Sequence, residues 1–340
     1  MPLNISSQQA ILSPSTISIQ TPPNHNSCTR VIPNMSKALL ITGATGKQGG
    51  AVIDALLSLP SSSDFTILAV TRDTNSGGAK KLAAKSDSIK LVQGNLDDIP
   101  ELFRNATEVA KQPIWGVYSV QISMGKGVTV ESEMKQGNGL IDESVKQGVK
   151  HFVYSSVERG GDEKSWNDPT PVGHFTSKYH IEQQLREAAG DKMGWTVLRP
   201  VAFMDNLAPG FPTKVFMTAL RDTLAGKPLQ WVATSDIGVF AAKAFEKPQE
   251  YNHKALGLAG DELDFDGLSR AFKNKTGYPA GTTFSMLGSA LMWGVAEMGT
   301  MVTWFKTDGY AADIPKLRKI HPGLMNMETW LEKKSPFVTK

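Results

Sequence analysis

Strand and helix signals alternate along this chain from Lys37 to about residue 200, and no other feature limits its fold so strongly. Short apolar runs typical of buried strands are separated by segments in which apolar residues recur every three or four positions, as on one helix face. The expected strands are 38–42, 66–71, 89–93, 115–120, 151–155 and 195–198, and the expected helices are 49–59, 78–85, 98–110, 130–147 and 175–189. Because parallel strands require crossover helices, this order predicts an α/β fold with a doubly wound parallel sheet.

The alternation fades beyond Pro200, where prolines and glycines separate shorter segments. We therefore expect a sheet domain over residues 36–200 and a smaller α+β lobe over residues 201–340, packed on the carboxyl edge of the sheet. Residues 1–35 are expected to form a disordered tail, since residues 1–34 contain no Asp or Glu and are rich in Ser, Thr, Pro, Asn and Gln. A targeting segment is the alternative for this stretch.

Composition excludes several classes of protein. A formal net charge of +3 without a dense basic stripe argues against direct binding of nucleic acid. The single cysteine, Cys28, excludes an internal disulfide, and no His or Cys spacing typical of a metal site is present. Residues 284–305 are apolar and about as long as a bilayer span, but Glu297 and three glycines interrupt them, so we expect a buried or pocket-lining helix and no membrane binding. The cytoplasm is the expected compartment, or the nucleus if the protein is a regulator.

The most specific motif follows the first expected strand directly and opens the first helix. It comprises Gly43, Ala44, Thr45, Gly46, Lys47, Gln48 and Gly49. In a Rossmann fold, glycines at this spacing allow a tight turn, a close approach of the backbone to a pyrophosphate, and close packing of the helix on the strand. The N–H groups of the helix N-terminus then face the phosphates. A plain glycine turn is the alternative, but the strand–turn–helix context favours a dinucleotide site.

The end of the second expected strand distinguishes the two nicotinamide cofactors. A carboxylate there binds the ribose hydroxyls of NAD, whereas this strand ends in Thr71, Arg72 and Asp73. The Arg72 guanidinium suits a 2′-phosphate, so the sequence favours NADP(H), although Asp73 weakens that preference if it faces the cofactor. The alternative is that Arg72 is a solvated surface charge.

A third polar patch, formed by Asn95, Leu96 and Asp97, follows the third expected strand. Side chains at this position can reach the edge of an adenine ring. An equally good interpretation is a turn in which Asp97 caps the next helix.

These motifs, in this order and spacing, resemble the NmrA-like family of atypical short-chain dehydrogenases/reductases. The resemblance covers about residues 36–330. Its marks are the segments Gly43–Gly50, Val70–Asp73, Gln93–Asp98, Lys135–Gly137, Tyr154–Val157, His174–Lys178, Arg199–Asn206 and Ile320–Gly323. That family contains NADP(H)-binding redox sensors and regulators without turnover, and it is similar to isoflavone-reductase-like enzymes that reduce small conjugated molecules.

The resemblance also implies a role for each matching residue. It places Gly43–Gly49 at the pyrophosphate, Arg72 at the 2′-phosphate, and Asn95, Leu96 and Asp97 near adenine. It further implies cofactor contacts for Ser119 to Gln121, for Lys135 at a phosphate or ribose, for Lys178 at the nicotinamide ribose, and for Pro200 to Phe203 along the nicotinamide pocket.

The catalytic residues depart from the usual pattern of short-chain dehydrogenases. Those enzymes carry a tyrosine four residues before a lysine on one helix face, so that the phenol can pass a proton to the substrate. Here Lys178 is present, but His174 stands where the tyrosine is expected, and Tyr179 lies about 100° round the helix. Ser155 and Ser156 resemble the serine position that usually hydrogen-bonds a carbonyl.

Three interpretations of this site stay open. In the first, the protein is an NADP(H)-dependent oxidoreductase of secondary metabolism that reduces a small imine or conjugated alkene, with the proton coming from Lys178, His174 or water. In the second, it is a non-catalytic NADP(H) sensor or transcriptional regulator that binds a partner protein. In the third, His174 only begins a helix and Lys178 only holds a ribose.

The expected second lobe contains a soft apolar set of residues, and methionine side chains adapt to irregular shapes. The set comprises Met286, Leu287, Leu291, Met292, Trp293, Met298, Met301 and Trp304. It suits a pocket for a bulky apolar substrate, and a plain core or a partner-binding helix is the alternative.

Overall fold

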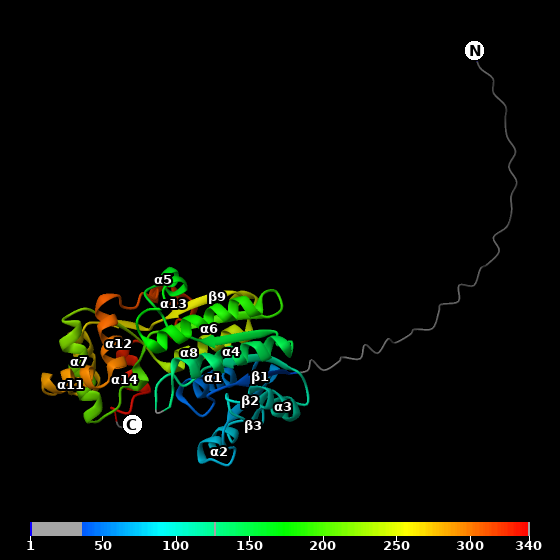
Figure 1. The fold of residues 1–340 in the computed structure, drawn as a ribbon, viewed down its shortest axis with the longest axis horizontal. Helices are drawn as coiled ribbons and strands as arrows, with labels where there is room; N and C mark the ends of the chain where they lie inside the picture. Colours follow the sequence, from blue (N-terminus) through cyan, green and yellow to red (C-terminus); the bar gives the residue numbers. More distant parts are fainter. Residues whose placement is uncertain (2–35, 126, 339–340) are drawn as a thin grey trace. The chain divides into compact units, whose positions relative to one another are not determined.

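The computed structural model describes Met1 and residues 36–125 and 127–338, so almost all of the expected tail lies outside the described residues. Seven parallel strands form the main sheet in the order β3-β2-β1-β4-β5-β6-β9 (Figure 1). Their bounds are β1 Lys37–Ile41, β2 Phe65–Thr71, β3 Ile89–Gln93, β4 Ile114–Ser119, β5 His151–Ser155, β6 Gly194–Pro200 and β9 Lys254–Leu258. The strand order reverses between β1 and β4, which confirms the doubly wound Rossmann architecture.

Helices cover both faces of this sheet, because successive strand residues point to opposite faces. Leu39 and Ile41 of β1 pack into one core with α1 (Lys47–Leu57) and α8 (Thr234–Glu246). Ala38 and Leu40 pack into a second core on the other face. The helices of that face are α3 (Ile99–Ala110), α4 (Val130–Lys146) and α6 (Gly173–Ala189). The short helices α2 (Gly77–Ala83), α5 (Asp162–Asn167) and α9 (Pro248–Tyr251) follow β2, β5 and α8 in the chain.

The expected domain boundary at residue 200 does not separate the main sheet from the smaller lobe. The strand β9 pairs in parallel with β6, and α8 packs on α1, yet both follow residue 200 in the sequence. A Cβ atom on Gly238 of α8 would lie 2.3 Å from the carbonyl oxygen of Ala51 on α1, so the two helices approach closely. After β6 the chain therefore leaves the main sheet and forms part of the smaller lobe. It then returns and adds β9 at the edge of the main sheet.

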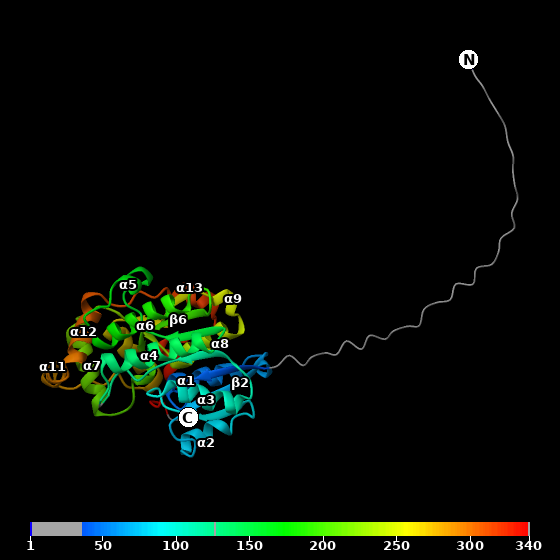
Figure 2. The ribbon, with the colours of Figure 1, turned by 45° about the vertical axis from the view of Figure 1, so that its right-hand side comes forward.

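A third core holds the smaller lobe together, with Trp231 and Trp330 among its fully buried side chains. The lobe contains a small sheet of the order β10-β8-β7 and several helices, of which α7, α11 and α12 lie together at one end in both ribbon views (Figures 1 and 2). Their bounds are β7 Ala202–Phe203, β8 Leu229–Val232, β10 Asp261–Leu263, α7 Phe211–Leu224, α10 Phe265–Thr276, α11 Ser285–Gly294, α12 Ala296–Thr307, α13 Ile314–Ile320 and α14 Met327–Lys333.

The apolar segment 284–305 forms two helices rather than the single helix that was expected. The first helix, α11, ends at Gly294, and α12 begins at Ala296. Val295 between them has a backbone φ of −123° and ψ of 87°, which is not helical. Within the described part of the chain, no helix is long and apolar enough to cross a membrane.

Candidate cofactor and substrate site

The glycine loop is folded tightly between β1 and α1. Gly43 has a backbone φ of +59°, and the N–H of Gly46 donates to the Gly43 carbonyl oxygen at 2.8 Å. A Cβ atom on Gly49 would lie 2.3 Å from the Gly43 carbonyl oxygen, so a side chain there would force helix and loop apart. These glycines therefore bring the N-terminus of α1 against the end of β1, which is the geometry that a pyrophosphate site needs.

Thr42 joins the ends of β1 and β4 at the point where the strand order reverses. Its hydroxyl donates to the Tyr118 and Val120 carbonyl oxygens, each at 3.1 Å, and accepts from the Val120 N–H at 2.8 Å. Ligands of open α/β sheets bind at this switch point. The sequence analysis did not identify this residue, because a threonine at the end of a strand carries no specific signal.

The remaining residues of the loop face different surroundings. Ala44 is buried and Thr45 is exposed. The Lys47 ammonium donates to the Asp205 carbonyl oxygen at 2.6 Å and to Asn206 Oδ1 at 3.3 Å, so it ties the loop to the start of the smaller lobe. Gln48 Oε1 accepts from Ser155 Oγ at 2.6 Å.

Arg72 is exposed immediately after β2, and its guanidinium forms no hydrogen bond or ion pair with any residue that the structure describes. Nearby, Asn95 and Gln136 donate to the Asp97 carboxylate at 2.9 and 2.8 Å, and these hydrogen bonds lower the pKa of Asp97. The cap of α3 is Asp98, not Asp97, since Asp98 accepts from the Glu101 N–H at 3.1 Å.

Leu96, expected near adenine, and Lys135, expected at a phosphate or ribose, are less constrained. Leu96 packs at the edge of the second core. Lys135 is exposed on α4, close enough to Asp97 to lower the pKa of that carboxylate slightly. No hydrogen bond fixes its ammonium within the described part of the chain.

A cavity of about 620 Å³ lies where the sheet meets the smaller lobe. Six of the predicted residues line it: Gln48, Gln121, His174 and Lys178 form its polar end, and Pro200 and Phe203 line it as well. Its other end is apolar and is lined by Phe216, Leu291, Met298, Met301, Phe305 and Tyr310. A mostly apolar pocket with a few convergent polar groups is the usual form of a small-molecule site.

Only part of the predicted soft apolar set lines this cavity. Leu291, Met298 and Met301 do so. Met286 and Trp293 on α11 are 77% and 89% exposed, so they lie on the surface of the lobe. Leu291 lies on α11 as well, so this helix presents one residue to the cavity and others to the surface.

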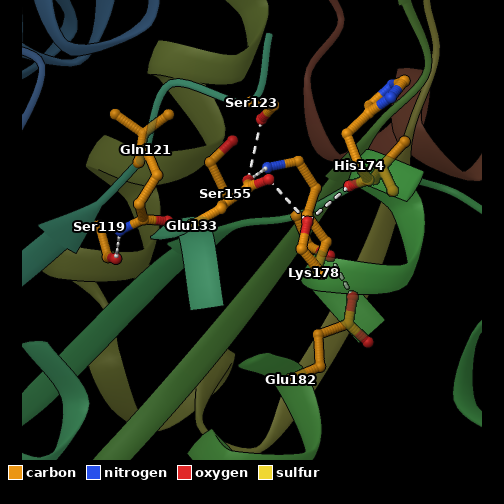
Figure 3. Close-up of polar contacts among 12 residues, drawn as sticks. Ser119, Gln121, Ser123, Glu133, Ser155, His174, Lys178 and Glu182 are labelled. Atoms are coloured by element: carbon orange, nitrogen blue, oxygen red, sulfur yellow. Dashed lines mark hydrogen bonds and ion pairs between the residues drawn. The ribbon is translucent and has the colours of Figure 1, made fainter. Parts of the chain in front are cut away.

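Lys178 is held by a buried carboxylate. Its ammonium lies 2.6 Å from Glu133 Oε1, and the two side chains are 9% and 1% exposed (Figure 3). Ser123 donates to the same Glu133 oxygen at 2.9 Å, and Ser177 donates to the other at 2.6 Å. Glu133 therefore joins α4, α6 and the loop after β4, and it is a site residue that the sequence analysis missed.

His174 lies in the first turn of α6 and is hydrogen-bonded to Glu297 of the smaller lobe. Its Nδ1 atom lies 2.6 Å from Glu297 Oε1, and its backbone N–H donates to the same oxygen at 3.1 Å. Burial lowers the pKa of His174, although the Glu297 carboxylate opposes that shift. The imidazole is therefore neutral at neutral pH and is fixed on the wall of the cavity.

The two serines at the end of β5 line the cavity and donate their hydroxyl hydrogens to acceptors within the protein. Ser155 donates to Gln48, and Ser156 donates to Glu182 Oε1. Glu182 is fully buried and is paired with Arg159 at 2.8 Å and with Arg199 at 2.7 Å. Both hydroxyl hydrogens are therefore directed to acceptors within the protein, and the role of these serines at a substrate carbonyl stays a prediction.

Tyr179 does not replace the missing tyrosine. Its ring faces the Arg159 guanidinium at 5.8 Å and does not line the cavity. Gln121, by contrast, does line it. Gln121 Nε2 donates to Ser119 Oγ at 2.9 Å, whereas its buried Oε1 atom has no hydrogen-bond partner among the described residues.

Comparison with known proteins agrees with this arrangement. The NmrA-like family model matches residues 35–331. The NmrA-like oxidoreductase lnaB of Aspergillus flavus is 35% identical over 262 residues, covering 72% of this chain and 74% of lnaB. The NmrA-like oxidoreductase hkm9 of Aspergillus hancockii is 27% identical and covers 73% of this chain and 75% of its own length.

Two solved structures share the fold. The negative transcriptional regulator NmrA, in complex with NADP, has a TM-score of 0.65 at 18% identity over 88% of this chain and 95% of its own. The triphenylmethane reductase of Citrobacter sp., complexed with NADP(H), has a TM-score of 0.64 at 18% identity over 87% of this chain and 98% of its own. Because the family model spans nearly the whole described chain and lnaB is 35% identical over most of it, this protein belongs to the NmrA-like family.

Proposed function

We propose that this protein is an NADP(H)-dependent oxidoreductase that reduces a small, largely apolar organic molecule such as an imine or a conjugated alkene. The observation that carries the proposal is the cavity of about 620 Å³, which is lined at one side by some of the residues predicted to bind the cofactor and at its other end by apolar side chains. A regulator that only binds the cofactor has no need of an apolar chamber beside Lys178 and His174.

The residues of the site fit a dinucleotide phosphate. The loop at Gly43 and Gly49 is too tight for side chains, and this leaves the backbone open to a pyrophosphate. The unpaired Arg72 guanidinium suits a 2′-phosphate, and the unpartnered Gln121 Oε1 suits an amide donor such as the nicotinamide carboxamide. NmrA and the triphenylmethane reductase were crystallised with NADP(H), which supports the same cofactor here.

The bound cofactor would supply the hydride, and the protein would supply position and charge. Lys178 would hold the nicotinamide ribose, with its ammonium fixed by Glu133. His174 is neutral and bound to Glu297, so it is a poor proton donor. Reduction of an iminium or a conjugated alkene suits such a site, because these substrates need less acid catalysis than a ketone.

Calorimetric titration with NADPH, NADP, NADH and NAD tests the cofactor assignment. Turnover is then tested by following cofactor absorbance with a panel of imines, enones and quinones. Consumption that is lost in Lys178→Ala supports the reductase. Failure of NADP(H) to bind, or of every panel compound to react, contradicts it.

A second function is favoured by one observation on the surface of the lobe. Phe284, Met286 and Trp293 are 79%, 77% and 89% exposed in and beside α11, and residues 284–296 contain no charged side chain. A redox sensor would use such a surface to bind a partner protein in the cytoplasm or nucleus. Cofactor-dependent capture of a defined partner, without turnover on the panel, would support that function.

A further inference from the structure

The cavity offers a ligand few free hydrogen-bond donors. Three of its hydroxyl groups, those of Ser123, Ser155 and Ser156, donate to Glu133, Gln48 and Glu182 respectively. The Lys178 ammonium is paired with Glu133. The side-chain N–H groups of Gln48 and Asn206 and the Thr213 hydroxyl also line the cavity and have no acceptor among the described residues, but the serine hydroxyls and the ammonium already have partners.

Tyr310 is different. It lines the same cavity, and its hydroxyl neither donates nor accepts a hydrogen bond among the residues that the structure describes. The Tyr154 hydroxyl is fully enclosed in the protein without a partner, whereas the Tyr310 hydroxyl is not fully enclosed. It therefore touches open space rather than packed protein.

The ring of Tyr310 is fixed in an aromatic cluster at the apolar end of the cavity. Its centroid lies 5.4 Å from that of Trp304, 5.2 Å from that of Phe305 and 6.4 Å from that of Phe175. Phe175 directly follows His174 on α6, whereas Phe305 belongs to α12 and the apolar end. The next residue anchors the backbone, since the Ala311 N–H donates to Glu158 Oε2 at 3.0 Å.

Resting on the reductase function proposed above, we propose that Tyr310 is the hydrogen-bond donor that orients the substrate, and that the preferred substrate is a bulky apolar compound with a neutral carbonyl oxygen conjugated to the reduced double bond. Hydride would add to the β-carbon of the alkene, and the electron pair of the double bond would move toward the oxygen. The Tyr310 hydroxyl would stabilise the resulting enolate oxygen, and water would supply the proton that completes the saturated ketone.

Burial raises the pKa of the Tyr310 phenol well above its ordinary value, and the nearby Glu158 carboxylate raises it further. The phenol therefore stays protonated at neutral pH and donates a hydrogen bond rather than the whole proton. A donor placed among apolar side chains such as Phe305 favours one orientation of a ligand, because an acceptor placed against those side chains would be left unpaired.

The test uses Tyr310→Phe, which removes one oxygen and keeps the ring. The matched control is Tyr154→Phe, because the Tyr154 hydroxyl is enclosed without a partner and lies in the core. The substrates are benzylideneacetone, an enone with a free oxygen lone pair, and N-methyl dihydroisoquinolinium, an iminium cation without any lone pair. We expect Tyr310→Phe to lower kcat/KM for the enone about 10- to 100-fold and to change kcat/KM for the iminium by less than about twofold.

Equal effects of Tyr310→Phe on both substrates, or no effect on either, would overturn the proposal. Binding of benzylacetone, the saturated ketone, to the NADP-loaded protein is measured as well, so that the outcome does not depend on turnover. If neither substrate is reduced but Tyr310→Phe weakens ketone binding about tenfold or more while Tyr154→Phe does not, the reductase function fails and the assignment of Tyr310 stands. If the wild-type protein binds no ketone, or both variants bind it equally well, the assignment of Tyr310 fails.

Discussion

The Lys178 ammonium and the Glu133 carboxylate form a buried ion pair at 2.6 Å, and this pair joins α6 to α4 beside the cavity. Removing one partner of a buried pair leaves the other charge without compensation, which costs about 3–5 kcal/mol. We therefore expect Glu133→Ala to lower the free energy of unfolding by about 3 kcal/mol in urea titrations. Glu108→Ala, on the exposed face of α3, serves as the control and should change the free energy of unfolding by less than about 0.5 kcal/mol. An unchanged midpoint for Glu133→Ala would show that the pair contributes nothing.

Arg72 should determine the choice of cofactor, because its guanidinium is exposed after β2 without an ionic partner in the described chain. We expect Arg72→Glu to weaken NADPH binding about tenfold or more and to leave NADH binding within about twofold, as measured by calorimetry. Lys90→Glu, an equal change of charge on the exposed side of β3, is the matched control. A ratio of NADPH to NADH affinity that stays the same in Arg72→Glu would refute this role.

Two adjacent glycines of α1 should respond in opposite ways to alanine. A Cβ atom on Gly49 would lie 2.3 Å from the Gly43 carbonyl oxygen, whereas one on Gly50 would lie 3.5 Å from the Ala44 carbonyl oxygen. We expect Gly49→Ala to weaken cofactor binding and to lower the unfolding temperature, because backbone must move. Gly50→Ala should raise the free energy of unfolding by up to about 1 kcal/mol through helix propensity. Thermal unfolding with and without NADPH measures the stability and the cofactor binding of each variant. Equal unfolding temperatures for the two variants would contradict the packing argument.

His151 should make the protein less stable in acid. Its side chain is 2% exposed, and burial, with the nearby His253, lowers the pKa of His151 from 6.5 to about 4. At mildly acidic pH the unfolded state therefore binds a proton at His151 that the folded state does not. The contribution of His151 to stability is complete above pH 6.5 and is lost as the pH falls toward 4. The loss amounts to about 3 kcal/mol.

The measurement is urea unfolding at a series of pH values. We expect His151→Gln to be less stable than the wild type at neutral pH, because His151 Nε2 shares a hydrogen bond with Thr196 Oγ1 at 2.9 Å. The same variant should lose less stability between pH 7 and pH 4, since it lacks the titrating group. Parallel curves for the two proteins would rule out this origin of the pH dependence.

Local patterns predicted the sheet of the first 200 residues closely. The ranges 89–93 and 151–155 coincide with β3 and β5, and the glycine loop lies between β1 and α1 as expected. Such elements are set by nearest neighbours along the chain: short apolar runs, helical spacing and glycines that permit a tight turn. The later elements α8 and β9 were not assigned to the sheet, because their partners α1 and β6 lie far away in the sequence.

The chemistry of the site was less predictable for the same reason. Glu133 and Glu297 lie on helices where a glutamate is usually solvated, and only tertiary packing turns them toward Lys178 and His174. The direction of the Ser156 hydroxyl depends on Glu182, 26 positions further along the chain. Glycines revealed the tight loop between β1 and α1 because they mark local backbone geometry, whereas polar partners carry no such local signature.

The return of the chain from the lobe to the sheet determines where this protein can be divided. A fragment that ends at residue 200 would lack the edge strand β9 and the helix α8, and it would leave one face of the sheet without Phe240 and Phe245. Such a fragment would expose an open strand edge and bare apolar surface, which favours aggregation. Chimeras that exchange substrate lobes between relatives should therefore replace residues 201–233 and 259–338 together and retain residues 234–258 with the sheet.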